Sequence, residues 1–314
     1  MKNRHLIIGS RSSKLAMVQA QYVRGVLKKF YPALDVEIET IKTAGDKIKD
    51  VALSRIGDKG LFTKEIEDAL LARRIDLAVH SIKDLPTDLP EGLKIAAVPE
   101  REDPREALVS EQAFTIATLP RGSRVGTSSL RRRVQLLHLR DDLNISDLRG
   151  NVDTRVAKLK NGSYDAIMLA YAGIKRLGLK LSLSVIPIEE IMPQAGQGAV
   201  GIEIRDGAEE IEKLVKVLDD ADSHLAIDAE RAALAGLEGG CQVPIGVYAA
   251  ITGDRIDIKA GIFSLDGKDG ELAGIEGSKK DARKLGQSLA ENILNKKTAC
   301  RILVEFKNMW RVPV

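Results

Sequence analysis

The sequence predicts an α/β protein with two similar α/β domains and a small C-terminal α+β domain. The chain has 314 residues, more than one hydrophobic core usually holds. Up to about residue 205, apolar segments typical of strands alternate with segments of helical periodicity, a pattern that indicates largely parallel sheets. After residue 243 the pattern changes to strand, turn and strand, followed by a helix.

The first unit begins with a strand and a long helix whose apolar residues recur at helical spacing. Its predicted elements are strand 5–9, helix 13–30, strand 35–41, helix 62–72, strand 75–81 and strand 93–99. The polar, proline-containing stretch at 100–106 marks the predicted crossing into the second unit.

The second unit repeats this order. Its predicted elements are strand 123–126, a helix opening at Thr127–Ser128, strand 144–148, helix 152–161 and strand 165–170. In both units a strand ends in Gly and a Ser-rich, basic helix start follows, GSRSSKL at 9–15 and GTSSLRR at 126–132. Two related α/β domains that face a cleft would explain the repetition, and so would chance similarity between βαβ units.

The remaining segments complete the first unit and form the third. The predicted elements are a glycine-punctuated strand at 196–205 that could return to the first sheet, helix 223–237 stopping at Gly239–Gly240, strands between 243 and 277, helix 280–296 and a final strand, RILVEF, at 301–306. We therefore predict three domains, which cover 1–100 with 195–217, 101–194, and 218–314.

The positive charge of the chain is concentrated in one segment. The net charge of +3 is too small to suggest a nucleic-acid coat. Residues 121–160, however, contain ten Lys or Arg against four Asp or Glu, a local net of +6. The basic segment 131–140 lacks the interleaved aromatic residues of a single-strand nucleic-acid surface. We expect no nucleic-acid partner.

The apolar stretches of the sequence are too short for a signal peptide or a membrane-spanning helix. Leu6, Ile7 and Ile8 near the N-terminus are far fewer residues than a signal-peptide core has, and no apolar run approaches 18 residues. We expect a cytoplasmic protein with no membrane partner. The two cysteines, Cys241 and Cys300, cannot build a disulfide framework. Cys300 fits a small buried hydrophobe, whereas Cys241, on a loop after two glycines, fits that interpretation less well.

The two Ser-rich helix starts are candidate anion sites, because helix N-termini offer free N–H groups and a positive dipole end. The contributing residues are Arg11, Ser13, Thr127, Ser128, Ser129, Arg131 and Arg132, joined by Arg149 and Arg155 at a strand-to-helix junction. Guanidinium groups suit planar carboxylates. The alternative is that the serines are only N-caps and the arginines are solvated.

The segment HSIKDLPTDLP at 80–90 ends a predicted buried strand, where α/β proteins bind ligands. Asp84 is the carboxylate there that could favour a cationic substrate, although Lys83 and Asp84 could also be an ordinary surface ion pair. His80, within the strand, is more typical of a core residue than of a catalyst, and we assign it no role.

Five motifs carry a resemblance to a known family. HSIKDLPT, VGTSSLRR, LRGNVDTR, GQGA and LEGGCQVPIG resemble, in order and across nearly the whole chain, the signatures of the porphobilinogen deaminase (hydroxymethylbilane synthase) family. This resemblance implies two domains like those of periplasmic binding proteins and a third domain whose cysteine carries a dipyrromethane cofactor through a thioether.

The resemblance also implies residue roles. Cys241 would be the attachment site and Asp84 the catalytic carboxylate. The implied cofactor-binding residues are Ser13, Lys83, Asp84, Thr127, Ser128, Ser129, Arg131, Arg132 and Arg149. The implied substrate-binding residues are Arg11, Ser13, Arg55, Arg149 and Arg155. Two positions depart from the family pattern, because Arg55 stands where Lys is expected and Gln194 where a less polar residue is expected.

The implied reaction joins four porphobilinogen molecules head to tail, with release of ammonia, to give hydroxymethylbilane for tetrapyrrole (haem) biosynthesis. It requires no metal, its partner is the small-molecule substrate, and we expect a monomer. The main alternative is a solute-binding protein for an oxyanion, which two similar lobes with anion sites would fit equally well. The Gly–Gly–Cys loop and the short N-terminal apolar stretch count against that alternative.

Overall fold

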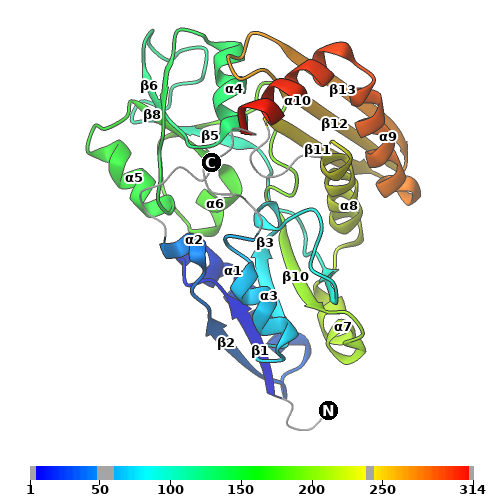
Figure 1. The fold of residues 1–314 in the computed structure, drawn as a ribbon. Helices are drawn as coiled ribbons and strands as arrows, with labels where there is room; N and C mark the ends of the chain where they lie inside the picture. The colour runs from blue at the N-terminus through cyan, green and yellow to red at the C-terminus, as the bar shows by residue number, and fades with distance from the viewer. Residues whose placement is uncertain (1–4, 48–59, 238–243, 311–314) are drawn as a thin grey trace.

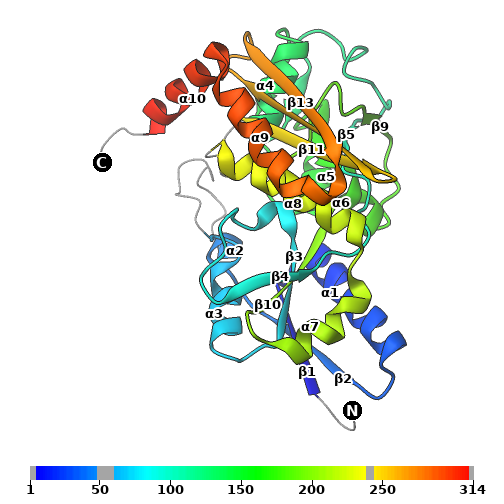
Figure 2. The ribbon, with the colours of Figure 1, turned by 90° about the vertical axis from the view of Figure 1, so that its right-hand side faces the viewer.

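The computed structural model describes residues 5–47, 60–237 and 244–310. Three β-sheets organise this part of the chain, two with five strands and one with three. The first sheet lies at the end of the molecule that carries the N-terminus, and the other two lie at the opposite end (Figures 1 and 2). The predicted fold class, two similar α/β domains and a small α+β domain, is confirmed.

The first sheet has the order β2-β1-β3-β10-β4. Its strands are β1 His5–Ser10, β2 Asp35–Thr40, β3 Leu77–Ser81, β4 Leu93–Ala97 and β10 Val200–Arg205. β1 pairs parallel with β2 and β3, whereas β10 runs antiparallel between β3 and β4. The prediction that the chain returns to the first sheet after residue 196 is therefore confirmed.

The second sheet repeats this arrangement, with the order β7-β6-β8-β5-β9. Its strands are β5 Glu106–Val109, β6 Arg124–Gly126, β7 Asn144–Ser146, β8 Ala166–Ala170 and β9 Leu183–Ile186. β6 pairs parallel with β7 and β8, and β5 runs antiparallel between β8 and β9. Both sheets thus share one topology, as the repeated sequence pattern predicted.

Helices cover the sheets with their apolar faces. Those of the first unit are α1 Lys14–Phe30, α2 Ala44–Lys47, α3 Lys64–Leu71 and α7 Glu209–Val215, and those of the second are α4 Leu130–Leu139, α5 Val152–Lys160 and α6 Tyr171–Arg176. In α1, Ala20, Val23 and Leu27 follow helical spacing and are fully buried in one core with Leu6 and Ile8 of β1. The predicted helix start at Thr127–Ser128 is a few residues early, because Ser129 is the N-cap of α4.

The third sheet is an antiparallel meander of β11 Ile245–Thr252, β12 Arg255–Phe263 and β13 Gly270–Ser278. The helices α8 Ala221–Gly236 and α9 Ala282–Leu294 share one core with it. They approach so closely that a Cβ at Gly286 would lie 2.2 Å from the carbonyl oxygen of Ala229. This position therefore requires glycine.

The predicted final strand is wrong, because residues 301–306 lie in helix α10, Lys297–Trp310. The buried residues of α10 are Ala299, Ile302, Leu303 and Phe306, which is helical spacing. The apolar letters of RILVEF fit a strand equally well, and only the packing of α10 on the third domain selects the helix. The prediction for Cys300 is also wrong, because its side chain faces outward and is exposed, with Sγ 2.7 Å from the carbonyl oxygen of Leu294.

Two chain segments connect the first two sheets, the outgoing crossing at 98–105 and the return crossing at 187–199. They lie side by side, since the backbone N–H of Glu102 donates to the carbonyl of Gly198 at 3.2 Å. Gly198 has φ +86°, and a Cβ there would lie 2.3 Å from the oxygen of Glu102. The domain limits predicted near these crossings stay a prediction.

A buried carboxylate ties both crossings to the third domain. Glu230 of α8 is fully buried and accepts two hydrogen bonds from Arg101, at 2.6 and 3.1 Å. Its oxygens also accept from the backbone N–H of Gly196 at 2.7 Å and of Ala249 in β11 at 2.8 Å. One side chain thus joins the outgoing crossing, the return crossing and the third sheet.

Candidate functional site

A large cleft with a volume of about 1620 Å³ brings together the segments that the sequence singled out. The helix starts of α1 and α4, the turn after β3 and residues of α8 line it. The predicted site residues in its lining are Arg11, Ser13, Lys83, Asp84, Ser128, Ser129, Arg131, Arg132, Arg149 and Arg155. Thr127 is buried next to this lining. Arg55 and Cys241 lie outside the described residues.

The serines at the helix starts are N-caps. Ser13 Oγ accepts a hydrogen bond from the N–H of Ala16 at 3.3 Å, and Ser129 Oγ accepts from the N–H of Arg132 at 3.4 Å. The interpretation of Ser13 and Ser129 as caps is thus confirmed, whereas the accompanying expectation of solvated arginines is wrong for Arg131 and Arg132, which are buried. A capping hydroxyl still has its own proton to donate, so capping and anion binding are compatible. The Ser128 hydroxyl donates to the carbonyl of Leu148 at 2.9 Å.

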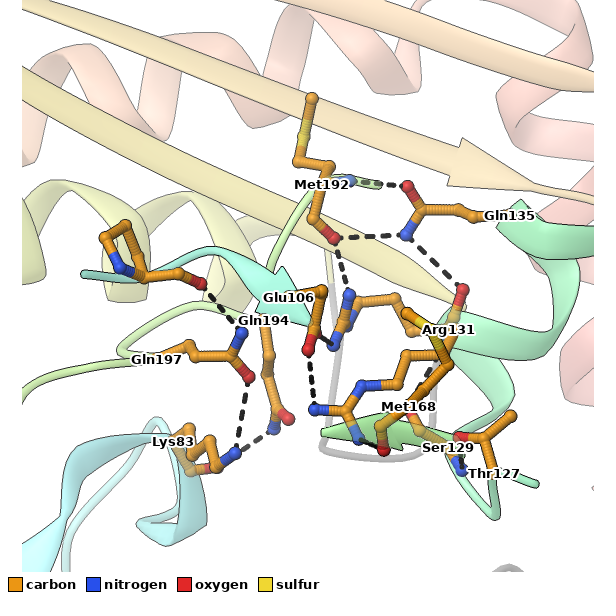
Figure 3. A network of polar contacts seen from close by, with 12 residues as sticks. Lys83, Glu106, Thr127, Ser129, Arg131, Gln135, Met168, Met192, Gln194 and Gln197 are labelled. Atoms are coloured by element: carbon orange, nitrogen blue, oxygen red, sulfur yellow. Dashed lines mark hydrogen bonds and ion pairs between the residues drawn. The ribbon is translucent and has the colours of Figure 1, made fainter. Parts of the chain in front are cut away.

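Arg131 and Arg132 share one buried carboxylate, Glu106 of β5. Arg131 Nη2 lies 2.5 Å from Glu106 Oε1, and Arg132 Nη2 lies 2.7 Å from Oε2 (Figure 3). Arg131 also donates to the carbonyl of Met192 and Arg132 to that of Met168. Burial by itself would raise the pKa of Glu106, but the charges of Arg132 and Arg131 lower it to about 2. Glu106 is therefore ionised at neutral pH.

Further cations lie around Arg131 and Arg132 in the cleft lining. Desolvation, followed by the charge of Arg132, lowers the pKa of Lys83 to about 8. The same two causes lower the pKa of Arg155 to about 10. The charges that act on Lys83, Glu106 and Arg155 belong to this same set of five cations and two carboxylates, namely Lys83, Arg131, Arg132, Arg149 and Arg155 with Asp84 and Glu106. A desolvated excess of positive charge favours the binding of anions.

Arg11 reaches the cleft from the loop between β1 and α1. Its guanidinium is 2.5 Å from Asp46 Oδ1 of α2 and lies over the ring of Phe62, 4.3 Å from the ring centroid. An ion pair and a cation–π contact together hold the planar group in one orientation. Arg11 is therefore held in one orientation in the lining of the cleft.

Asp84 lies on the short 3-10 turn Ile82–Asp84 that follows β3. It is exposed and lines the cleft. Arg231 of α8 fixes the chain just beyond the turn, since its Nη2 donates to the carbonyls of Pro86 and Thr87 at 2.7 and 2.9 Å. His80, by contrast, is buried with Nε2 3.0 Å from Glu203 Oε2, so its interpretation as a core residue is confirmed.

Sequence reasoning missed four residues of this site, which are Asp46, Phe62, Glu106 and Arg231. Each acts by holding another residue of the cleft, and its partner is distant in the sequence. The only signal for Glu106 was physical, since two adjacent arginines on a buried helix start require a counter-charge. No local pattern indicated which carboxylate supplies it.

The fold and the cleft define a class, α/β proteins in which two units of the same topology line one large cleft with arginines and helix N-termini. In the described part of the chain no helix has the length and apolar character needed to span a bilayer, and no group of three or more His, Cys, Asp or Glu could hold a metal ion.

Comparison with known proteins identifies the family. Residues 6–213 match the family model "Porphobilinogen deaminase, dipyromethane cofactor binding domain", and residues 224–295 match "Porphobilinogen deaminase, C-terminal domain". The chain therefore belongs to the porphobilinogen deaminase family, a family of transferases. The alternative of a solute-binding protein is set aside.

Individual relatives agree over nearly the full length. The porphobilinogen deaminase of Syntrophobacter fumaroxidans is 47% identical over 97% of this chain and 99% of its own length. That of Roseiflexus sp. is 52% identical over 92% of this chain and 96% of its own, and that of Carboxydothermus hydrogenoformans is 49% identical over 97% and 98%. Among solved structures, the methionine binding protein MetQ superimposes on 70% of this chain and 92% of its own, with a TM-score of 0.45 and 14% identity. This similarity is too low to support a conclusion about the present chain.

Proposed function

We propose that this protein condenses four porphobilinogen molecules head to tail, releasing ammonia from each, on a dipyrromethane bound covalently to Cys241. The observation that carries the proposal is the convergence of five cations, Lys83, Arg131, Arg132, Arg149 and Arg155, on one cleft, where burial lowers the pKa of Lys83 and of Arg155. Porphobilinogen carries an acetate and a propionate, so each addition brings two carboxylates into the cleft. We further propose that the enzyme acts in the cytoplasm as a monomer.

The residues present fit a cofactor that bears carboxylates. The Nε atoms of Arg131 and Arg132 are buried and, within the described residues, have no hydrogen-bond partner. Lys83, Arg149, Thr127 and the serines Ser13, Ser128 and Ser129 complete the set that would hold its acetate and propionate groups. When bound, the dipyrromethane supplies the pyrrole carbon to which the first substrate is joined.

Asp84 stabilises the positive charge that develops on the substrate. As the C–N bond of the aminomethyl group breaks, ammonia leaves with the bonding electrons and the pyrrole becomes a cationic azafulvene. A carboxylate near the pyrrole N–H favours this state both by its charge and as a hydrogen-bond acceptor. The pyrrole carbon that makes the attack must lose its proton, and Asp84 would be the group suited to accept it.

The arginines select and orient the substrate. Arg11, Arg149 and Arg155, with Arg55, are proposed to bind its acetate and propionate, since guanidinium groups match carboxylates bidentately. The contacts of Arg11 with Asp46 and Phe62 orient one of these groups before substrate arrives. Orientation in advance lowers the entropic cost of aligning the aminomethyl carbon for attack.

Intact mass and activity test the proposal together. We expect purified protein to carry a covalent adduct with the mass of a dipyrromethane and to convert porphobilinogen to hydroxymethylbilane. Cys241→Ala should lose both the adduct and the activity, because no thiol remains to form the thioether. Cys300→Ser is the matched control and should keep both. An active wild-type protein without an adduct, or an adduct retained in Cys241→Ala, would refute the attachment.

A further inference from the structure

We infer that Gln194 is a positioning residue for Asp84, because its side-chain amide holds the backbone of the turn that carries this carboxylate. The inference rests on the proposed function of Asp84 and assigns a role to a residue at which this chain departs from the expected family pattern. Gln194 belongs to the return crossing, is half-buried and lines the cleft.

The contact joins two segments that are 111 residues apart. Gln194 Nε2 donates a hydrogen bond of 2.9 Å to the carbonyl oxygen of Lys83, the residue before Asp84 (Figure 3). Lys83 and Asp84 end the 3-10 turn Ile82–Asp84, and carbonyls at the end of a helical turn lack partners within that turn. The amide of Gln194 supplies such a partner.

Fixing this carbonyl fixes Asp84. The carbonyl of Lys83 and the N–H of Asp84 belong to one planar peptide unit. Rotation of that unit would turn the backbone of Asp84 and swing its carboxylate within the cleft. A hydrogen bond to the oxygen opposes this rotation, so the direction of the Asp84 side chain depends on Gln194.

Other contacts hold the rest of the turn, whose own 3-10 hydrogen bond runs from the N–H of Leu85 to the carbonyl of Ile82 at 3.0 Å, and Gln194 adds a bond at the peptide between Lys83 and Asp84. Before it, the N–H of Ile82 donates to the carbonyl of Ala199 at 3.1 Å. After it, Arg231 binds the carbonyls of Pro86 and Thr87. Both sides of the turn are thus held by backbone-directed bonds, and Gln194 completes the series at the peptide next to Asp84.

A second glutamine of the return crossing acts on the same residue. Gln197 Oε1 accepts a hydrogen bond from Lys83 Nζ at 3.3 Å, and its Nε2 donates to the carbonyl of Pro104 in the outgoing crossing at 2.7 Å. The return crossing therefore contacts Lys83 at its carbonyl through Gln194 and at its ammonium through Gln197. The position of the turn is coupled to the two crossings that join the α/β domains.

Gln194→Met and Gln194→Glu test the role. Methionine keeps the length of the side chain but has no donor, and ionised glutamate places an acceptor against the Lys83 carbonyl. We expect kcat to fall roughly 3- to 10-fold in Gln194→Met, the range set by one neutral hydrogen bond, with KM for porphobilinogen nearly unchanged. The fall should be larger in Gln194→Glu. Gln287→Met, on the exposed face of α9, is the matched control and should behave as wild type.

Two readouts separate positioning from other roles. Intact mass should give full cofactor loading in both variants, and single-turnover rates on the loaded protein should fall as kcat does. Wild-type kcat in both fully loaded variants would overturn the inference, even if their melting temperatures fell. A raised KM with unchanged kcat would also overturn it, since Gln194 would then bind substrate. If the wild-type protein did not consume porphobilinogen, the proposed function itself would fail first.

Discussion

Replacing Glu230 by Gln should strongly destabilise the protein, although the two side chains have nearly the same shape. Each carboxylate oxygen accepts two hydrogen bonds, Oε1 from Arg101 and Ala249 and Oε2 from Arg101 and Gly196. An amide in either orientation turns its NH₂ group toward one arginine N–H and one backbone N–H. Two buried donors then lose their acceptor, and Arg101, whose side chain is 10% exposed, loses its counter-charge.

The expected loss is about 3–5 kcal/mol in the free energy of unfolding, the range for a buried ion pair that loses one partner. Urea unfolding of the full chain, followed by circular dichroism, measures it as a lower midpoint. The double variant Arg101→Met/Glu230→Gln should lose less than the sum of the two single variants, because the uncompensated charge is then absent. A loss below about 1 kcal/mol in Glu230→Gln would refute the idea that this carboxylate holds the crossings to the third domain.

Three further predictions concern Lys83 and Asp84 in the cleft and Gly198 in the return crossing. The pKa of Lys83, about 8, predicts that cofactor loading of the apoprotein falls as pH rises through that value, because Lys83 then loses the positive charge proposed to bind the cofactor carboxylates. Intact mass after loading at a series of pH values measures this, Lys83→Arg should remove the inflection, and an unchanged inflection would assign it to another group. Asp84→Asn should lower single-turnover rates on the order of 10²-fold, and Asp84→Glu should lower them by less, since Glu retains the charge. Near wild-type turnover in Asp84→Asn would contradict the role proposed for Asp84. Gly198→Ala should lower the free energy of unfolding by about 1–3 kcal/mol, because φ there is +86° and a Cβ would meet the carbonyl oxygen of Glu102. Gly178→Ala is the control, since Gly178 has φ +61° but open space around it, and it should lower the free energy of unfolding by less in the same assay.

The cleft shows where sequence reasoning succeeded and where it could not. The helix start at Ser13, the strand before Asp84 and the basic helix start at Arg131 were identified because each is encoded within a few neighbouring residues. Their convergence on one cleft was one of two explanations of the repeated order of strands and helices, and the structure selects it over chance similarity. The partner of Arg131 did not follow, because Glu106 lies 25 residues away with no local signal.

The sequence by itself indicated most of the local elements, the repeated order of strands and helices and the residues able to carry the chemistry. These depend on periodicity, capping and motif spacing, which act over short stretches of chain. The tertiary structure alone decided that residues 301–306 are helical, that Glu230 meets Arg101 across 129 residues and that Gln194 meets Lys83 across 111. Such contacts depend on which distant segments the sheet order brings together. The residues next to a side chain in the sequence therefore do not indicate which distant residue it will contact.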